Sequence, residues 1–134
     1  MPASRVLVID DEPFIRQILE YGLKAEGFEV MTARDGAEGL AVARREHPDC
    51  VVCDIMMPEI DGYTVCRELK IAAATRAIPV VLLSAKGSAI DVETGFAAGC
   101  DDYVTKPFSP RKLTDLVRTL LAKSHDGSAD ATAA

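Results

Sequence analysis

Short apolar runs recur along the chain, and four of them end in a polar residue. The runs are 6–9 before Asp10 and Asp11, 50–53 before Asp54, 80–83 before Ser84, and 103–105 before Lys106. Unbroken apolar runs of this length are typical of parallel strands that are covered by helices on both faces. The pattern therefore predicts four buried, parallel strands.

Helical patterns alternate with these runs. The first predicted helix starts at Pro13 and ends at Gly27, and the second runs from Asp35 to just before Pro48. Two further helices cover 62 to about 74 and roughly 88–98, and a fifth starts at Ser109–Pro110. A short β-prone segment, 28–33, adds a fifth strand, and Asp35 with Glu38 forms a capping-box pattern. Repeated strand–helix units of this kind predict an α/β fold with a parallel sheet.

A chain of 134 residues corresponds to one domain, which we place at 1–123. From Ser124 onward the residues are small and polar, so we expect 124–134 to be a flexible tail or the start of a linker.

The polar residues that follow the strands predict a common site. Open α/β sheets bind ligands beyond the carboxyl ends of their strands, so three carboxylates, a hydroxyl and an ammonium group converge there. Carboxylates this close raise one another's pKa, and a hard cation such as Mg²⁺ relieves that repulsion. Asp10, Asp11 and Asp54 suit Mg²⁺, and no His or Cys cluster favours zinc.

A carboxylate can also attack phosphorus and form an aspartyl-phosphate. Asp54 stands alone on its strand and is the predicted nucleophile, while Lys106 and Ser84 can bind the phosphoryl oxygens. Each residue taken singly has an ordinary interpretation as a helix cap, a turn former or a boundary residue. Their shared position at the ends of different strands favours the site.

Composition narrows the function further. The net charge of −6 and the pI near 4.9 argue against nucleic acid as a direct partner. No apolar run approaches the ~20 residues that cross a membrane, and the N-terminus lacks a signal-peptide core, so we expect a cytoplasmic protein.

Cys50 and Cys53 have C-x-x-C spacing, but residues three apart on a strand face opposite sides, so we interpret both as buried hydrophobes.

The ordered set of motifs resembles the receiver domain of two-component response regulators, over about Arg5 to Lys123. The matching segments are Val8-Ile9-Asp10-Asp11-Glu12, Asp54-Ile55-Met56-Met57-Pro58 with Asp61-Gly62, Ser84-Ala85, and Tyr103-Val104-Thr105-Lys106-Pro107-Phe108. The resemblance implies a doubly wound, flavodoxin-like sheet of five parallel strands in the order 2-1-3-4-5, between two layers of helices.

The resemblance also implies roles for individual residues. Asp54 would accept a phosphoryl group from the phosphohistidine of a sensor histidine kinase or phosphotransfer protein. Asp10, Asp11, Asp54 and the carbonyl of Met56 would hold Mg²⁺, and Lys106 would pair with the phosphoryl group, with a cis bond to Pro107. Ser84 and Tyr103 would form the switch pair.

Two further positions, Met56 and Lys86, would flank the phosphoryl group and influence access of the hydrolytic water. Because a thioether does not orient water strongly, we hypothesise slow hydrolysis of the aspartyl-phosphate. The resemblance places the output surface for an effector on the fourth helix, fifth strand and fifth helix. Arg111, Lys112, Arg118 and Lys123 could give this surface positive charge or could simply form a solvated helix face.

Three other functions are weaker alternatives. A haloacid-dehalogenase-type phosphatase needs an Asp where Met56 stands, and a flavodoxin-like flavin protein needs a phosphate loop where Asp10 and Asp11 stand. A phosphorylation-independent interaction module would not need the complete set of acids. We therefore expect no enzyme acting on other substrates, but a protein that phosphorylates and dephosphorylates itself with Mg²⁺ and has no membrane partner.

Overall fold

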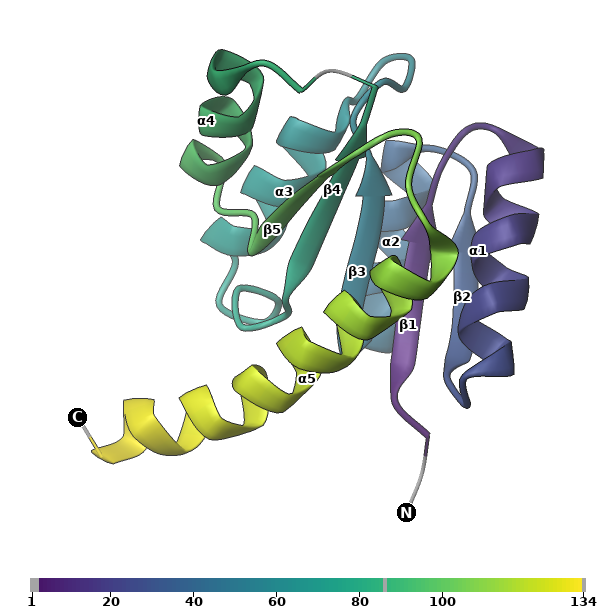
Figure 1. The fold of residues 1–134 in the computed structure, drawn as a ribbon. Helices are drawn as coiled ribbons and strands as arrows, with labels where there is room; N and C mark the ends of the chain where they lie inside the picture. Colours follow the sequence, from purple (N-terminus) through teal and green to yellow (C-terminus); the bar gives the residue numbers. More distant parts are fainter. Residues whose placement is uncertain (1–2, 86, 134) are drawn as a thin grey trace.

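Five parallel strands form one sheet in the order β2-β1-β3-β4-β5 (Figure 1), as the resemblance implies. The computed structural model describes residues 3–85 and 87–133, with side chains described as far as Lys123. The strands are β1 (Arg5–Ile9), β2 (Glu29–Ala33), β3 (Cys50–Asp54), β4 (Val80–Ser84) and β5 (Asp102–Thr105). The helices are α1 (Pro13–Ala25), α2 (Gly36–Glu46), α3 (Gly62–Ile71), α4 (Ala89–Ala97) and α5 (Pro110–Ala133).

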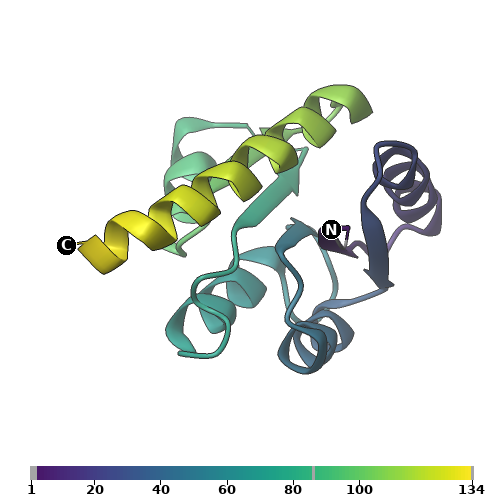
Figure 2. The ribbon, with the colours of Figure 1, turned by 90° about the horizontal axis from the view of Figure 1, so that it is seen from below.

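Helices cover both faces of the sheet, which explains why the central strands are apolar throughout. α1 and α5 pack on one face, and α2 and α3 pack on the other (Figure 2). Alternate residues of β1 divide between the two layers, with Val6 and Val8 toward α1 and α5, and Leu7 and Ile9 toward α2 and α3. Every residue of β3 and β4 is buried.

The cysteines behave as buried hydrophobic residues, as predicted for two of them. Cys50 lies in the core layer under α1 and α5, whereas Cys53 lies in the opposite layer, so their thiols cannot meet. All four cysteines are free and buried, and burial raises the pKa of each thiol.

Side-chain caps fix the starts of three helices. The Asp35 carboxylate accepts a hydrogen bond from the Glu38 amide (2.8 Å), Asp61 accepts from Thr64 (2.9 Å), and Ser88 accepts from Asp91 (3.2 Å). These caps place the starts of α2, α3 and α4 where the sequence predicts them.

The end of α3 differs from the prediction, and α5 extends beyond the predicted domain boundary. α3 ends at Ile71 rather than near Ala74, because Ala72 is extended and the Thr75 hydroxyl donates to the Leu69 carbonyl. α5 continues to Ala133, beyond Lys123, since no proline interrupts it. The domain boundary at 123 stays a prediction. Within the described part of the chain, no helix is both long and apolar enough to cross a membrane.

Candidate phosphoryl and metal site

Three carboxylates meet at the carboxyl-terminal edge of the sheet. Asp54 is the last residue of β3, and Asp10 directly follows the neighbouring strand β1, where its amide donates to the Ala33 carbonyl (3.1 Å). Asp10, Asp11 and Asp54 each offer an oxygen, and these oxygens lie within 4.8 Å of one another. The parallel topology thus brings together the acids that the sequence predicts to share a site.

Asp10 is held firmly but keeps one oxygen available. Its Oδ1 accepts a hydrogen bond from the Glu12 amide (2.9 Å), whereas its buried Oδ2 accepts none from the described residues. The Arg16 guanidinium donates to the main-chain carbonyl of Asp10 (2.7 Å) from the first turns of α1. Sequence reasoning missed Arg16, although a cation one helical turn beyond Pro13 and close after two acids was a usable signal.

Lys106, just beyond β5, is the cation of the site. Its Nζ donates to Oδ1 of Asp54 (3.0 Å) and lies 3.6 Å from Oδ2 of Asp10. The bond between Lys106 and Pro107 is cis, as the resemblance implies. One ammonium group therefore faces two buried carboxylates.

Burial makes it unfavourable for the Asp10 and Asp54 carboxylates to be charged. Burial raises the pKa of Asp54 to about 6, the Lys106 hydrogen bond opposes this rise, and the charge of Asp10 adds to it. Burial also raises the pKa of Asp10. Burial alone lowers the pKa of Lys106, but the hydrogen bond to Asp54 and the charge of Asp10 outweigh it, so this pKa is raised.

These residues fit a divalent cation. The donor set consists of carboxylate oxygens, which Mg²⁺ prefers, and the unbonded Oδ2 of Asp10 is buried beside the carboxylate of Asp54. One ammonium group leaves excess negative charge, which a divalent ion would balance. The acidic cluster therefore supports a site for a divalent cation.

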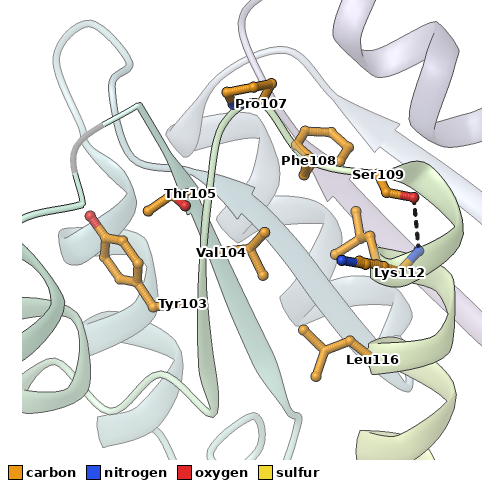
Figure 3. Close-up of a pocket in the computed structure, with 9 residues that line it drawn as sticks. Tyr103, Val104, Thr105, Pro107, Phe108, Ser109, Lys112 and Leu116 are labelled. Carbon is orange, nitrogen blue, oxygen red and sulfur yellow. Dashed lines mark hydrogen bonds between the residues drawn. The ribbon is translucent and has the colours of Figure 1, made fainter.

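Ser84 and Tyr103, the predicted switch pair, lie on neighbouring strands. Ser84 is the fully buried last residue of β4, and Leu82 of the same strand is in register with Tyr103 of β5. The amide of Lys106 donates to the Ser84 carbonyl (2.7 Å), so Ser84 borders the site. Tyr103 packs with the layer of α2 and α3, whereas Val104 packs toward α5 on the other side of β5 (Figure 3).

The loop after β3 places Met56 at the surface. The Met56 side chain is 55% exposed, whereas that of Met57 is 8% exposed and packs in the core. Gly62 lets the loop close tightly, because a Cβ atom there would lie 2.5 Å from the Asp54 carbonyl oxygen. The predicted partner of Met56 in tuning hydrolysis, Lys86, lies outside the described residues.

A groove of about 440 Å³ lies between β5 and the start of α5 (Figure 3). Tyr103, Val104, Lys112 and Leu116 are among its lining residues, so the predicted output surface has a hollow beside Tyr103. One of the four basic residues that could give this surface positive charge points elsewhere. Arg118 pairs with Glu26 (3.1 Å) and lies 5.8 Å from the centre of the Phe28 ring, on the α1 side of α5.

Comparisons with known proteins agree with this geometry. The family model for the response regulator receiver domain matches residues 6–118. "Probable transcriptional regulator ycf27" of Cyanophora paradoxa is 46% identical over 129 residues, which cover 96% of this chain and 53% of the relative. DNA-binding response regulator MtrA of Mycolicibacterium smegmatis is 40% identical over 127 residues, which cover 95% of this chain and 54% of the relative.

Solved structures show the same fold. The chemotaxis protein CheY4 of Vibrio cholerae matches with a TM-score of 0.84 and 30% identity, over 88% of this chain and 98% of that one. The chain spans about half the length of the curated relatives it matches. On the family match and these identities, the chain belongs to the response regulator receiver domains of two-component systems.

Proposed function

We propose that this chain is a phosphorylation-activated switch in which Asp54 accepts a phosphoryl group in a Mg²⁺-dependent reaction. The observation that carries the proposal is the contact between Asp54, which is 3% exposed, and the Lys106 ammonium group 3.0 Å away. Burial of a charged carboxylate is costly unless it is paired, and here the partner, Lys106, also suits a phosphoryl oxygen.

The proposed reaction is a single displacement. An Asp54 carboxylate oxygen attacks the phosphorus of a phosphohistidine, the P–N bond breaks, and the imidazole nitrogen leaves with the electron pair. Lys106 and the Ser84 hydroxyl bind the oxygens of the transferred group. Mg²⁺, held by Asp10, Asp11, Asp54 and the Met56 carbonyl, would neutralise the charge of the phosphoryl group when bound.

The donor would be a histidine kinase or phosphotransfer protein. An apolar depression beside the site supports a protein donor, because Ile15 and Ile18 of α1 line it together with Lys106 and Phe108. Phe14 and Tyr21 extend this apolar surface along α1 and are 70% and 80% exposed. A donor docked there would lie next to the cation that receives the phosphoryl group.

The output would be a change in the surface of α4, β5 and α5, followed by binding of an effector protein or domain. The groove that runs from Tyr103 to Leu116 and the exposed ammonium group of Lys112 support this surface. The expectation that nucleic acid is no direct partner applies to this span alone, because relatives about twice as long are named as transcriptional or DNA-binding regulators.

Intact-mass measurement tests the proposal. The protein is incubated with Mg²⁺ and acetyl phosphate, and Asp54→Asn and Asp115→Asn are treated in the same way. We expect wild type and Asp115→Asn, which changes an exposed residue of α5, to gain the mass of one phosphoryl group, and Asp54→Asn to gain none. Equal gain by Asp54→Asn, or no gain by wild type, would show that Asp54 is not the acceptor. Sustained release of phosphate from a monoester would instead favour a phosphatase.

A further inference from the structure

Arg16 reaches back from the start of α1 to the loop that carries two of the three clustered acids. α1 begins at Pro13, and the Arg16 guanidinium donates to the main-chain carbonyl of Asp10 (2.7 Å). The main-chain amide of Arg16 donates to the carbonyl of Glu12 (3.1 Å). Arg16 is therefore bonded to the main chain on both sides of Asp11, the acid that lies between these two residues.

The Arg16 bond ties this loop to the body of a helix. The side chain of Glu12, the residue that precedes α1, makes no capping hydrogen bond within the described part of the chain. Oδ1 of Asp10 accepts a hydrogen bond from the Glu12 amide (2.9 Å), but that bond lies within the loop itself. The Arg16 side chain comes from outside the loop, so it fixes the position of residues 10–12 relative to α1.

Arg16 also brings positive charge to the site without taking up a carboxylate oxygen. Its described hydrogen bond goes to the main chain of Asp10, and the buried Oδ2 of this residue accepts no hydrogen bond from the described residues. The Lys106 ammonium group, in contrast, donates directly to a carboxylate oxygen of Asp54. A cation that binds the main chain offsets part of the negative charge and leaves the side-chain oxygens of Asp10 and Asp11 to a metal ion.

We propose that Arg16 is a positioning residue of the metal site, whose guanidinium holds the main chain of Asp10 and Asp11 in the arrangement that binds a divalent cation. This proposal rests on the proposed function, in which the cation is Mg²⁺. Arg16 acts through the main chain of the loop. Hydrogen bonds outside the ligand set commonly orient the ligands of a metal ion, and their loss weakens metal binding.

A simpler interpretation is that Arg16 only provides a partner for a buried carbonyl group. Asp10 is fully buried, and a buried carbonyl without a hydrogen bond destabilises the fold. In that case the loss of the guanidinium would lower the free energy of unfolding but leave the Mg²⁺ affinity of the folded protein unchanged. The two interpretations therefore differ in the dissociation constant for Mg²⁺.

The test measures the Kd of Mg²⁺ for the unphosphorylated protein, from the NMR shifts of the amide signals of residues 10–12. The titrations are run in about 1 M KCl, where the screening length is about 3 Å, so that the lost charge alone has little effect. We expect Arg16→Met to raise the Kd about two- to tenfold, the effect of losing one net hydrogen bond. Arg16→Lys should stay within about twofold of wild type, because an ammonium group can donate to the same carbonyl.

Arg34→Met is the matched control. Arg34 directly follows β2 at the same edge of the sheet, and its side chain is 76% exposed and pairs with Glu38 (3.3 Å). The substitution removes one positive charge near the site but no hydrogen bond to residues 10–12, so the Kd should match that of wild type. Urea unfolding of each variant without Mg²⁺ measures any loss of stability separately.

The outcomes separate this proposal from the proposed function. If wild type binds Mg²⁺ and is phosphorylated on Asp54, but Arg16→Met binds Mg²⁺ as tightly, the positioning role is wrong and the function stands. A rise in Kd that is equal in Arg34→Met, or equal in Arg16→Lys, would likewise refute a role for the hydrogen bond. If wild type binds no Mg²⁺, both proposals fail.

Discussion

The ammonium nitrogen of Lys106 lies 3.0 Å from a carboxylate oxygen of Asp54, although 52 residues separate the two along the chain. Both residues stand at the ends of parallel strands, and Asp10 approaches the same ammonium group to 3.6 Å. The site therefore holds a buried excess of negative charge, and several measurable properties follow from it.

Asp54→Asn should stabilise the fold at neutral pH. The folded pKa of Asp54, about 6, exceeds its ordinary value of 3.8, so the folded state holds more protons between these values and loses stability as the pH rises through that window. The shift corresponds to about 3 kcal/mol as an upper value. We expect urea unfolding at pH 7 to show a gain of about 1–3 kcal/mol, which shrinks as the pH falls toward 4. Asp115→Asn should show no such pH-dependent gain.

Lys106→Met should have the opposite effect. Removal of the ammonium group leaves Asp54 and Asp10 without their cation, and breaking a buried pair costs more than breaking a surface pair. Because the Lys106 side chain is 19% exposed, water offsets part of this cost, and we expect a loss of about 1–3 kcal/mol at pH 7. The phosphorylation rate should fall at least tenfold. Lys112→Met, which removes an exposed cation of α5, provides the control and should leave both quantities near wild type.

Mg²⁺ should stabilise the folded protein through the same carboxylates. A ligand that binds only the folded state adds about 2.7 kcal/mol at one hundred times its Kd. We expect Mg²⁺ to raise the unfolding midpoint at pH 7 and to raise it less at pH 5, where protons compete for Asp54. Asp11→Asn should weaken this response, whereas Glu12→Gln, a change at an exposed neighbour, should not. An undiminished response in Asp11→Asn would show that Asp11 does not contribute to metal binding.

Met56→Asn should shorten the lifetime of the aspartyl-phosphate. The Met56 side chain is exposed beside Asp54 and offers water only a weak acceptor, whereas an amide can orient an attacking water. We expect faster loss of the phosphoryl group, by a few-fold, when decay is followed by intact mass after removal of the donor. Met57→Leu, a substitution at a buried neighbour, should decay like wild type. Hydrolysis no faster in Met56→Asn would contradict the hypothesis.

Most of the fold could be predicted from short stretches of sequence, because the polar residues that follow apolar strands and the residues that cap helices are short-range signals. The apolar runs before Asp54 and Lys106 placed both residues at one edge of the sheet, and Asp35 and Ser88 start their helices as expected. The end of α3 was not predictable, since it depends on the side chain of Thr75 folding back to Leu69.

Residues that act across elements were harder to predict. Tyr63 has the pattern of an ordinary core aromatic residue, but its hydroxyl donates to the Asp91 carbonyl of α4, a contact that depends on how α3 and α4 meet. The sequence left open whether Arg118 charges the output surface or lies on a solvated helix face, and the rotation of α5 turns it toward Glu26 and Phe28. Such contacts depend on the three-dimensional packing of helices, which hydrophobic periodicity alone does not specify.

The most direct test of the central claim is chemical mapping of the acceptor. Borohydride reduces an acyl phosphate to an alcohol, so it converts a phosphorylated aspartate to homoserine. After treatment with acetyl phosphate, Mg²⁺ and borohydride, peptide mass spectrometry should find homoserine at position 54 and at no other aspartate. Homoserine at position 10 or 11, or at none of the three positions, would contradict the assignment of Asp54 as the phosphoryl acceptor.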